Sequence, residues 1–175
     1  GVDLVTFSGD KLLGAVQCGV IAGRQDLIET IRKNPMKRAL RVDKVTLAIL
    51  NATLKLYTQP EQLVEHLPLL RTLTLTPQQL EVRAEAVMAN LPARVQGTII
   101  TSEAQIGSGA LPDQNIDSVA VSLTHDTLSA QKLAEALRYA TVPVIGRLKD
   151  GRVLLDMHGA DPIDELITVL TGLEL

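Results

Sequence analysis

The chain has 175 residues, of which 46% are hydrophobic and 21% charged, a balance typical of a folded globular protein rather than a disordered one. The formal net charge of -3 and the aromatic content of 2% exclude a uniformly basic nucleic-acid-binding surface and an aromatic platform for stacked bases. The single cysteine excludes an internal disulfide and fits a reducing cytoplasm, and no run reaches the roughly 18 apolar residues of a membrane helix.

The first element that the sequence predicts is a β-hairpin with a lysine in its loop. Two short apolar runs, at residues 2–7 and 18–23, flank a turn of small and polar residues that contains Lys11. A lysine amine is a nucleophile only when unprotonated, and a tight turn after a strand can present such a side chain. A solvated lysine in a polar loop is the alternative interpretation. The chain begins at Gly1-Val2-Asp3, inside this β-prone run, which indicates a piece of a longer polypeptide.

Helices and a group of basic residues follow the hairpin. We expect Asp26 to cap a short helix that ends at Arg32-Lys33, where basic side chains suit the helix dipole. Asn34-Pro35 then interrupts the chain. Residues 43–57 predict a long helix that is apolar on much of its circumference, which is usual for a helix packed on more than one side.

The C-terminal part predicts a small α/β domain with helices on one face of its sheet. A helix is expected from Thr76-Pro77 to about Asn90. The elements expected after it are strands at 95–101 and 118–123, a helix at 129–139, strands at 142–148 and 153–157, and a helix from 161 to about 170. Lys149-Asp150-Gly151 predicts a hairpin turn between the last two strands.

The segment around Lys11 resembles the cofactor-lysine segment of fold-type-I pyridoxal-phosphate enzymes. Ser8-Gly9-Asp10-Lys11-Leu12-Leu13-Gly14 and the glycine-punctuated run at 17–23 are most similar to the bacterial selenocysteine synthase family, the L-seryl-tRNA(Sec) selenium transferases. The similarity continues through residues 33–44 and 56–57, and returns at 102–112, 143–147, 150–152 and 155–156.

The resemblance implies a three-part α/β organisation and a function. Residues 1–42 would be the tail of the large cofactor-binding domain with its lysine hairpin, residues 43–75 connecting helices, and residues 76–175 the small C-terminal domain. The intact protein would convert seryl-tRNA(Sec) to selenocysteinyl-tRNA(Sec), with pyridoxal 5'-phosphate as cofactor and selenophosphate as selenium donor. The family also implies a homo-oligomer, a decamer, without a membrane partner, that contacts tRNA mostly through parts absent from this chain.

The same resemblance implies the cofactor-binding residues. Lys11 would be the catalytic residue that binds the cofactor, while Ser8 and Gln17 would contact it; a serine that only satisfies the turn backbone is the alternative for Ser8. Residues 14–19 depart from the family's usual Gly-Gly-Pro-Gln-Ala-Gly, which puts efficient catalysis in doubt. Cys18 stands where the family has alanine, and we expect a small buried thiol there.

Three arginines are the candidate substrate-binding residues. Arg38 and Arg41 are three apart, so they share a face if the segment is helical, and two guanidinium groups suit the oxygens of a phosphate. The family resemblance assigns them to selenophosphate and assigns Arg147 to the substrate carboxylate. A solvated basic face and a surface hairpin charge are the respective alternatives.

Other functions remain open at this point. The chain could belong to another fold-type-I enzyme that acts on a small amino acid or amino sugar, or to a cysteine-desulfurase-like protein, although the desulfurase pattern has histidine where this chain has Asp10. A non-catalytic interaction module is the alternative from a different class. No metal site is expected, because His66, His125 and His158 are widely scattered.

Overall fold

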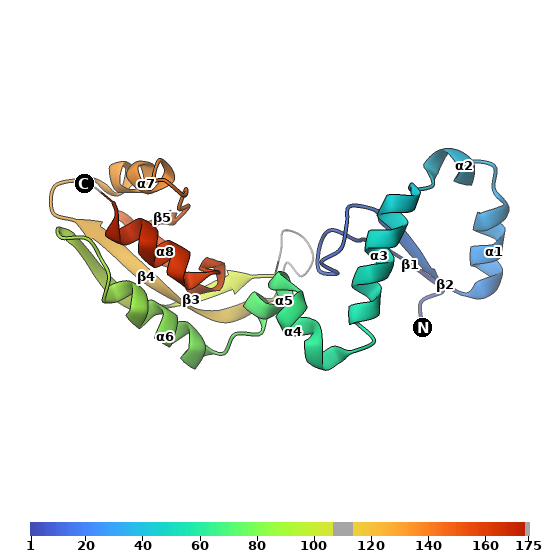
Figure 1. Cartoon of the computed structure of the whole chain (residues 1–175), viewed down its shortest axis with the longest axis horizontal. Coiled ribbons are helices and arrows are strands. Elements are labelled where there is room, and N and C mark those ends of the chain that lie inside the picture. Colours follow the sequence, from blue (N-terminus) through green and yellow to red (C-terminus); the bar gives the residue numbers. More distant parts are fainter. Residues whose placement is uncertain (107–113, 174–175) are drawn as a thin grey trace. The chain divides into compact units, whose positions relative to one another are not determined.

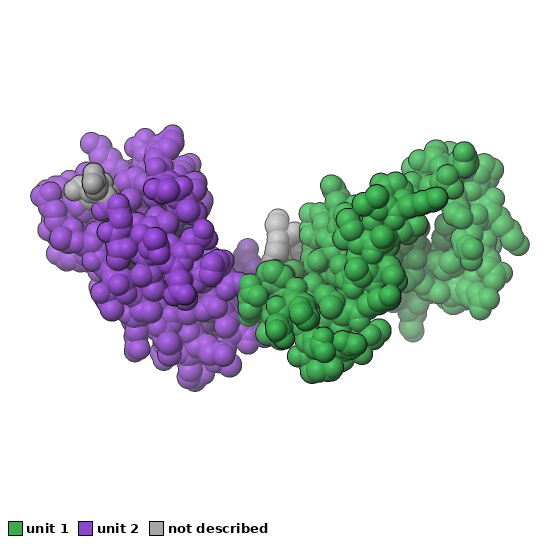
Figure 2. Space-filling view, viewed as in Figure 1, with its two compact units in different colours: residues 1–71 green, residues 72–175 purple. Residues whose placement is uncertain are grey.

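The computed structural model describes residues 1–106 and 114–173 of the chain. Its contacts divide it into two compact units, unit 1 with residues 1–71 and unit 2 with residues 72–175 (Figure 2). Within the described ranges, no helix combines the length and the apolar composition that crossing a membrane requires. The two units differ in how much apolar surface they bury.

Unit 1 begins with the predicted β-hairpin (Figure 1). Strands β1 (Leu4–Ser8) and β2 (Gly19–Gly23) are antiparallel, and their register places Ser8 opposite Gly19. The prediction of a strand, a lysine-bearing loop and a returning strand is therefore confirmed. The helices that follow in the chain are α1 (Gln25–Lys33), α2 (Lys37–Leu40), α3 (Lys44–Leu56), the 3-10 helix η1 (Pro60–Gln62), α4 (Leu63–His66) and α5 (Pro68–Leu73).

Side-chain caps explain where two of these helices begin. Asp43 is the N-cap of α3, and its carboxylate accepts from the backbone N–H of Thr46 at 2.9 Å. This hydrogen bond holds the pKa of Asp43 below its ordinary value. The expectation for Asp26 is wrong, because the N-cap of α1 is Arg24. The Arg24 guanidinium binds the Asp26 carboxylate at 2.7 Å, so that carboxylate pairs with a side chain instead of capping the helix.

Unit 1 leaves most of its apolar side chains exposed. Among its described residues, the buried hydrophobic side chains are Cys18 and Leu67. On α3 the buried residue is Thr53, whereas Val45 and Leu47 are more than half exposed. The expected burial of α3 on more than one side is thus not found, because the hairpin and short helices of this unit supply no second layer against it.

Unit 2 is an antiparallel sheet with helices (Figure 1). The strands pair in the order β3-β4-β6-β5. Its elements are α6 (Pro77–Met88), β3 (Val95–Gln105), β4 (Asn115–His125), α7 (Ala130–Arg138), β5 (Arg147–Lys149), β6 (Arg152–Asp156), the 3-10 helix η2 (Met157–Gly159) and α8 (Ile163–Thr171). The helix predicted from Thr76-Pro77 is confirmed, since Thr76 and Gln79 form a reciprocal capping box.

The hairpin between β5 and β6 confirms one prediction and corrects another. Asp150 and Gly151 have positive φ angles of 50° and 72°, as a two-residue turn of this type requires, and Lys149 pairs with Arg152. The strand predicted at 142–148 is wrong in its first part, because β5 begins only at Arg147. The backbone N–H of Val144 donates to the Leu137 carbonyl at 2.9 Å, so this segment binds the end of α7 instead of a strand.

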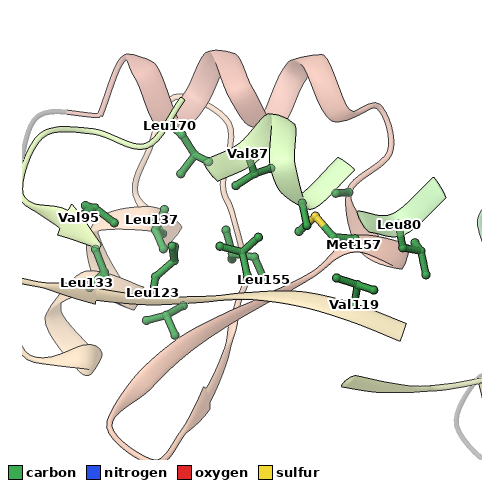
Figure 3. Close-up of a cluster of buried hydrophobic side chains, with 14 residues drawn as sticks. Leu80, Val87, Val95, Val119, Leu123, Leu133, Leu137, Leu155, Met157 and Leu170 are labelled. Carbon is green, nitrogen blue, oxygen red and sulfur yellow. The ribbon is translucent and has the colours of Figure 1, made fainter. Parts of the chain in front are cut away.

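The core of unit 2 lies on one face of its sheet. Helices α6, α7 and α8 all contribute to a single buried cluster against β4 and β6 (Figure 3). Its members include Leu80, Val87, Val119, Val121, Leu123, Leu133, Leu137, Val153, Leu155 and Leu170. Because side chains alternate along a strand, the opposite face of the same strands carries other residues, among them Ser118 and Asp156. That face holds the polar groups described below.

Two valines on α6 provide a matched test of this core. Val87 is fully buried and Val82 is 65% exposed. We predict that Val87→Ala lowers the free energy of unfolding by about 2 kcal/mol, because it removes two buried methyl groups and leaves a cavity. Val82→Ala should change it by less than about 0.5 kcal/mol. Urea denaturation followed by circular dichroism measures both, and equal effects of the two substitutions would contradict this position of the helix.

Candidate functional site

The loop between β1 and β2 is closed by hydrogen bonds of its own backbone. The N–H of Gly9 donates to the Cys18 carbonyl at 2.8 Å, and the N–H of Ala15 donates to the Gly9 carbonyl at 2.8 Å. Inside the loop, the N–H of Gly14 donates to the Lys11 carbonyl at 2.8 Å, with Gly14 at a φ of 69°. Lys11 therefore lies on a defined turn, as its sequence context predicts.

Gly9 allows the two sides of this loop to approach each other. A Cβ atom at this position would lie 2.6 Å from the Val16 carbonyl oxygen and 2.7 Å from the Cys18 Sγ. Both distances are shorter than side-chain carbons tolerate, so a glycine is required here. Cys18 is buried against this glycine, which confirms the expectation of a small buried thiol.

A tyrosine of α3 anchors the same loop. The Tyr57 hydroxyl, at the C-cap of α3, donates to the Leu13 carbonyl at 2.9 Å. Partial burial raises the pKa of Tyr57, so the hydroxyl keeps the proton that it donates. Sequence reasoning missed this role. The available signal was a single aromatic residue at the end of an otherwise aliphatic helix.

Three candidate residues lie together on this hairpin, and all three are exposed. They are Lys11 in the turn, Ser8 at the end of β1 and Gln17 just before β2. The Lys11 side chain is 70% exposed, and its Nζ is 2.9 Å from Asp10 Oδ2. An amine, a hydroxyl and an amide are groups that fit a cofactor with an aldehyde and a phosphate: the amine can bind the aldehyde, and the other two can donate to phosphate.

Arg38 and Arg41 lie on and just after α2. This helix is a single turn that ends at Leu40, and the N–H of Arg41 still donates to the Lys37 carbonyl at 3.0 Å. Arg41 itself has extended backbone and lies outside the helix, so the condition under which both arginines share a helical face is not met. Both side chains are exposed. The hydrogen bonds and ion pairs in the described part of unit 1 do not join either arginine to the Lys11 turn.

Arg147 lies in unit 2, at the start of β5 rather than at the end of a strand. Its Nη2 donates to Ser102 Oγ at 2.8 Å and to Asp156 Oδ2 at 3.2 Å. The Arg147 side chain remains 57% exposed. The contact with Asp156 lies on the face of the sheet that faces away from the core, and Arg147 lines a groove of about 1000 Å³ there.

Asp156 is the centre of this polar network. Besides Arg147, its carboxylate accepts from Ser118 Oγ at 2.7 Å, from Ser102 Oγ at 3.2 Å and from the backbone N–H of His158 at 3.1 Å. These donors come from β3, β4, β5 and η2. A partly buried carboxylate with this many donors has its hydrogen-bonding capacity satisfied. Its contact with Arg147 therefore positions the guanidinium group at the groove.

His125 and His158 both place ring nitrogens against backbone groups. His125 Nδ1 accepts from the backbone N–H groups of Thr127 and Leu128, each at 3.1 Å, which is the structural role expected for it. The buried His158 places its ring nitrogens against two backbone carbonyls. Over residues 1–106 and 114–173, no group of three or more candidate ligands could hold a metal ion. The similarity at 107–112 lies outside the described residues.

Comparison with known proteins identifies relatives over most of the chain. The family model described as L-seryl-tRNA selenium transferase matches residues 1–161. An L-seryl-tRNA(Sec) selenium transferase of Haemophilus influenzae is 45% identical over an alignment of 180 positions, which covers 99% of this chain and 39% of that protein. Proteins of the same name from Serratia proteamaculans and Hyphomonas neptunium are 46% and 45% identical, over 98% and 90% of this chain. The chain spans about 39% of the length of the first of these relatives.

The ion pair beside the candidate site gives a pH-dependent prediction. The hydrogen bond from the Lys11 ammonium holds the pKa of Asp10 below its ordinary value of 3.8. Because the folded-state pKa is lowered, the stabilisation by this pair is present above pH 3.8 and is lost as the pH falls through the lowered value. Carboxyl NMR titration should show this depressed midpoint in the wild type. Lys11→Met should raise the midpoint toward 3.8, Lys55→Met should not, and an unchanged midpoint in Lys11→Met would contradict the pairing.

Proposed function

The chain belongs to the L-seryl-tRNA selenium transferase family, and from this premise we propose that the protein containing it converts seryl-tRNA(Sec) to selenocysteinyl-tRNA(Sec). The proposed cofactor is pyridoxal 5'-phosphate, and the proposed selenium donor is selenophosphate. The observation that carries the proposal is the family match over residues 1–161, which includes the exposed lysine on its closed hairpin loop. The proposal also places the protein in the cytoplasm, where it forms a homo-oligomer.

Lys11 is the proposed cofactor-binding and catalytic residue. When bound, pyridoxal phosphate supplies an electron sink for the α-carbon of the seryl group. The Lys11 Nζ binds the cofactor and later accepts and returns the α-proton of the substrate. Ser8 and Gln17 donate hydrogen bonds to the cofactor phosphate. The loop bonds at Gly9 and the anchor from Tyr57 support this role, because they fix the backbone from which the amine extends.

Arg38 and Arg41 are the proposed ligands of the selenium donor. Selenophosphate is a small anion, and guanidinium groups donate to phosphate oxygens in pairs. Both side chains are exposed and available to a ligand, and among the described residues neither has an ion pair with a carboxylate. Their place after α1, on a short helix and its C-cap, puts two guanidinium groups within four residues of chain.

Arg147 is the proposed contact of the substrate carboxylate. The bonds to Ser102 and Asp156 use Nη2, and the Arg147 side chain is still 57% exposed. The groove of about 1000 Å³ that it lines offers room for an aminoacyl group. In this proposal residues 1–42 belong to the cofactor-binding domain, residues 43–75 connect it, and residues 76–175 form the small domain.

The exposed apolar side chains of unit 1 support the proposed oligomer. Large hydrophobic residues on β1, α2 and α3 are exposed in this chain, including Val5, Leu40 and Val45. Exposed apolar surface beyond scattered single residues usually marks an interface. We assign it to contacts with the rest of the protein and with its copies in the homo-oligomer, a decamer in this family.

The cofactor assignment predicts a spectroscopic change. In the full-length protein, Lys11→Ala should abolish the visible absorption of bound pyridoxal phosphate, because it removes the amine that binds the cofactor. Lys55→Ala, which alters an exposed lysine at the end of α3, should keep the band. Persistence of the band in Lys11→Ala would falsify the assignment.

The donor assignment predicts a selective defect. Arg38→Ala or Arg41→Ala should raise the selenophosphate concentration needed for half-maximal rate by roughly 10- to 150-fold, since loss of one charge-assisted contact costs about 1.5–3 kcal/mol. The visible cofactor band should be unchanged. Arg138→Ala, an exposed arginine in the last turn of α7, is the control. Normal donor dependence in both variants would remove these arginines from the site.

A further inference from the structure

The positive charge of unit 1 is concentrated in one stretch. Residues 32–44, called the basic segment here, hold six of the 17 basic residues of the chain and one of its 20 acidic residues. The other 162 residues therefore carry 11 basic and 19 acidic side chains. The six cations are Arg32, Lys33, Lys37, Arg38, Arg41 and Lys44. The basic segment thus carries a charge of +5, whereas the whole chain has a net charge of -3.

These cations are exposed and available. All six side chains are exposed, and across the described residues the structure gives none of them an ion pair. The single acidic residue of the segment, Asp43, is the N-cap of α3. Its carboxylate accepts hydrogen bonds from the backbone N–H and the hydroxyl of Thr46. The basic segment is therefore not neutralised within its own unit.

Fold stability does not explain the placement of all these residues. Arg32 and Lys33 lie in the last turn of α1, where cations stabilise the helix dipole. Lys44 is different, because it is the first residue of α3, where a positive charge opposes the dipole. Lys37 lies in the single turn of α2 directly before Arg38, so two like charges are adjacent in the chain. Lys37 and Lys44 are thus better explained by a ligand than by the fold.

The elements place the segment on an outer part of unit 1. In Figure 1, α1 and α2 form an arm that leads away from the hairpin and returns to α3. The segment runs from the end of α1 through α2 to the start of α3. Its cations are spread along three elements, which suits a ligand with several phosphates better than a single small anion.

The chemistry of the segment favours a nucleic-acid backbone. Centres of protein–protein interfaces are depleted in charged residues, whereas six of these 13 residues are basic. The segment has no aromatic side chain on which a base could stack. Ammonium and guanidinium groups without aromatic partners bind phosphates and carry little sequence information.

We propose that the basic segment binds the phosphodiester backbone of the tRNA substrate, with Lys33, Lys37 and Lys44 as the contacts that the selenium donor does not use. This inference rests on the proposed function, and it assigns an RNA contact to this chain itself. In this arrangement Arg38 and Arg41 bind selenophosphate. The lysines around them bind the phosphates of the tRNA backbone. Release of counterions from the RNA drives the binding, so it depends on salt.

The test measures the salt dependence of tRNA binding by the full-length protein. The variants are Lys33→Gln, Lys37→Gln, Lys44→Gln and their triple combination, with Lys132→Gln on α7 as the matched control. The probes are the seryl-accepting tRNA(Sec) and an unrelated tRNA. Each single variant should reduce the slope of log K against log salt by about 1, and the triple variant by about 3. Both tRNAs should lose the same number of contacts.

Each outcome has a defined meaning. A slope and an affinity of the triple variant equal to those of the control overturn the inference, and so does a loss confined to tRNA(Sec), because a backbone contact does not read sequence. If the wild-type protein fails to bind tRNA(Sec), the proposed function fails instead. The visible cofactor band should stay unchanged in all lysine variants, which separates lost RNA contacts from a damaged site.

Discussion

The close approach of the two sides of the hairpin loop at Gly9 is the constraint on which the candidate site depends. A side chain at this position would collide with Val16 and Cys18, so the loop could not form the hydrogen bonds of Gly9 with Cys18 and Ala15. Those bonds, the Gly14 turn and the hydroxyl of Tyr57 define the backbone around Lys11. The lysine side chain itself is left exposed to meet a ligand. A defined backbone with an exposed functional group is the usual way in which a loop positions a reactive residue.

The two units differ in which surfaces they bury and which they expose. Unit 2 buries a continuous aliphatic core between its helices and one face of its sheet, and it uses the opposite face for a network centred on Asp156. Unit 1 buries little and exposes apolar and basic surface instead. The basic segment and the exposed faces of β1 and α3 are surfaces that other molecules or other parts of the protein can cover. This division fits a chain that spans about 39% of the length of a relative.

Local sequence signals predicted the parts of the fold that depend on local physics. Residues 2–23 predicted the lysine hairpin, Thr76-Pro77 predicted a helix start, and Asp150-Gly151 predicted a turn, because glycine, proline and capping side chains act over a few residues. The contacts that complete the candidate sites were not predictable in this way. Tyr57 meets Leu13 across 44 residues, and Ser102 meets Asp156 across 54.

The wrong predictions also concern residues whose conformation depends on contacts that the local sequence does not show. Residues 142–146 have the composition of a strand, but tertiary contact with the end of α7 decides their conformation. Asp26 has the residue type of a cap, but Arg24 binds its carboxylate. The roles of Ser8, Gln17, Arg38, Arg41 and Arg147 came from family resemblance and remain proposals. The sequence predicted the hairpin that carries Ser8 and Gln17, and the structure adds the positions of Arg38 on α2, Arg41 just after it and Arg147 on β5.

The central claim is that Lys11 is the residue to which the cofactor binds. The most direct measurement is borohydride reduction of the full-length protein with pyridoxal phosphate, followed by digestion with a protease that does not cut at lysine and by mass spectrometry of the peptides. The account predicts one phosphopyridoxyl group, on the peptide that contains Lys11. A label on a different lysine, or a Lys11 peptide that stays unmodified while the protein binds the cofactor, would contradict it.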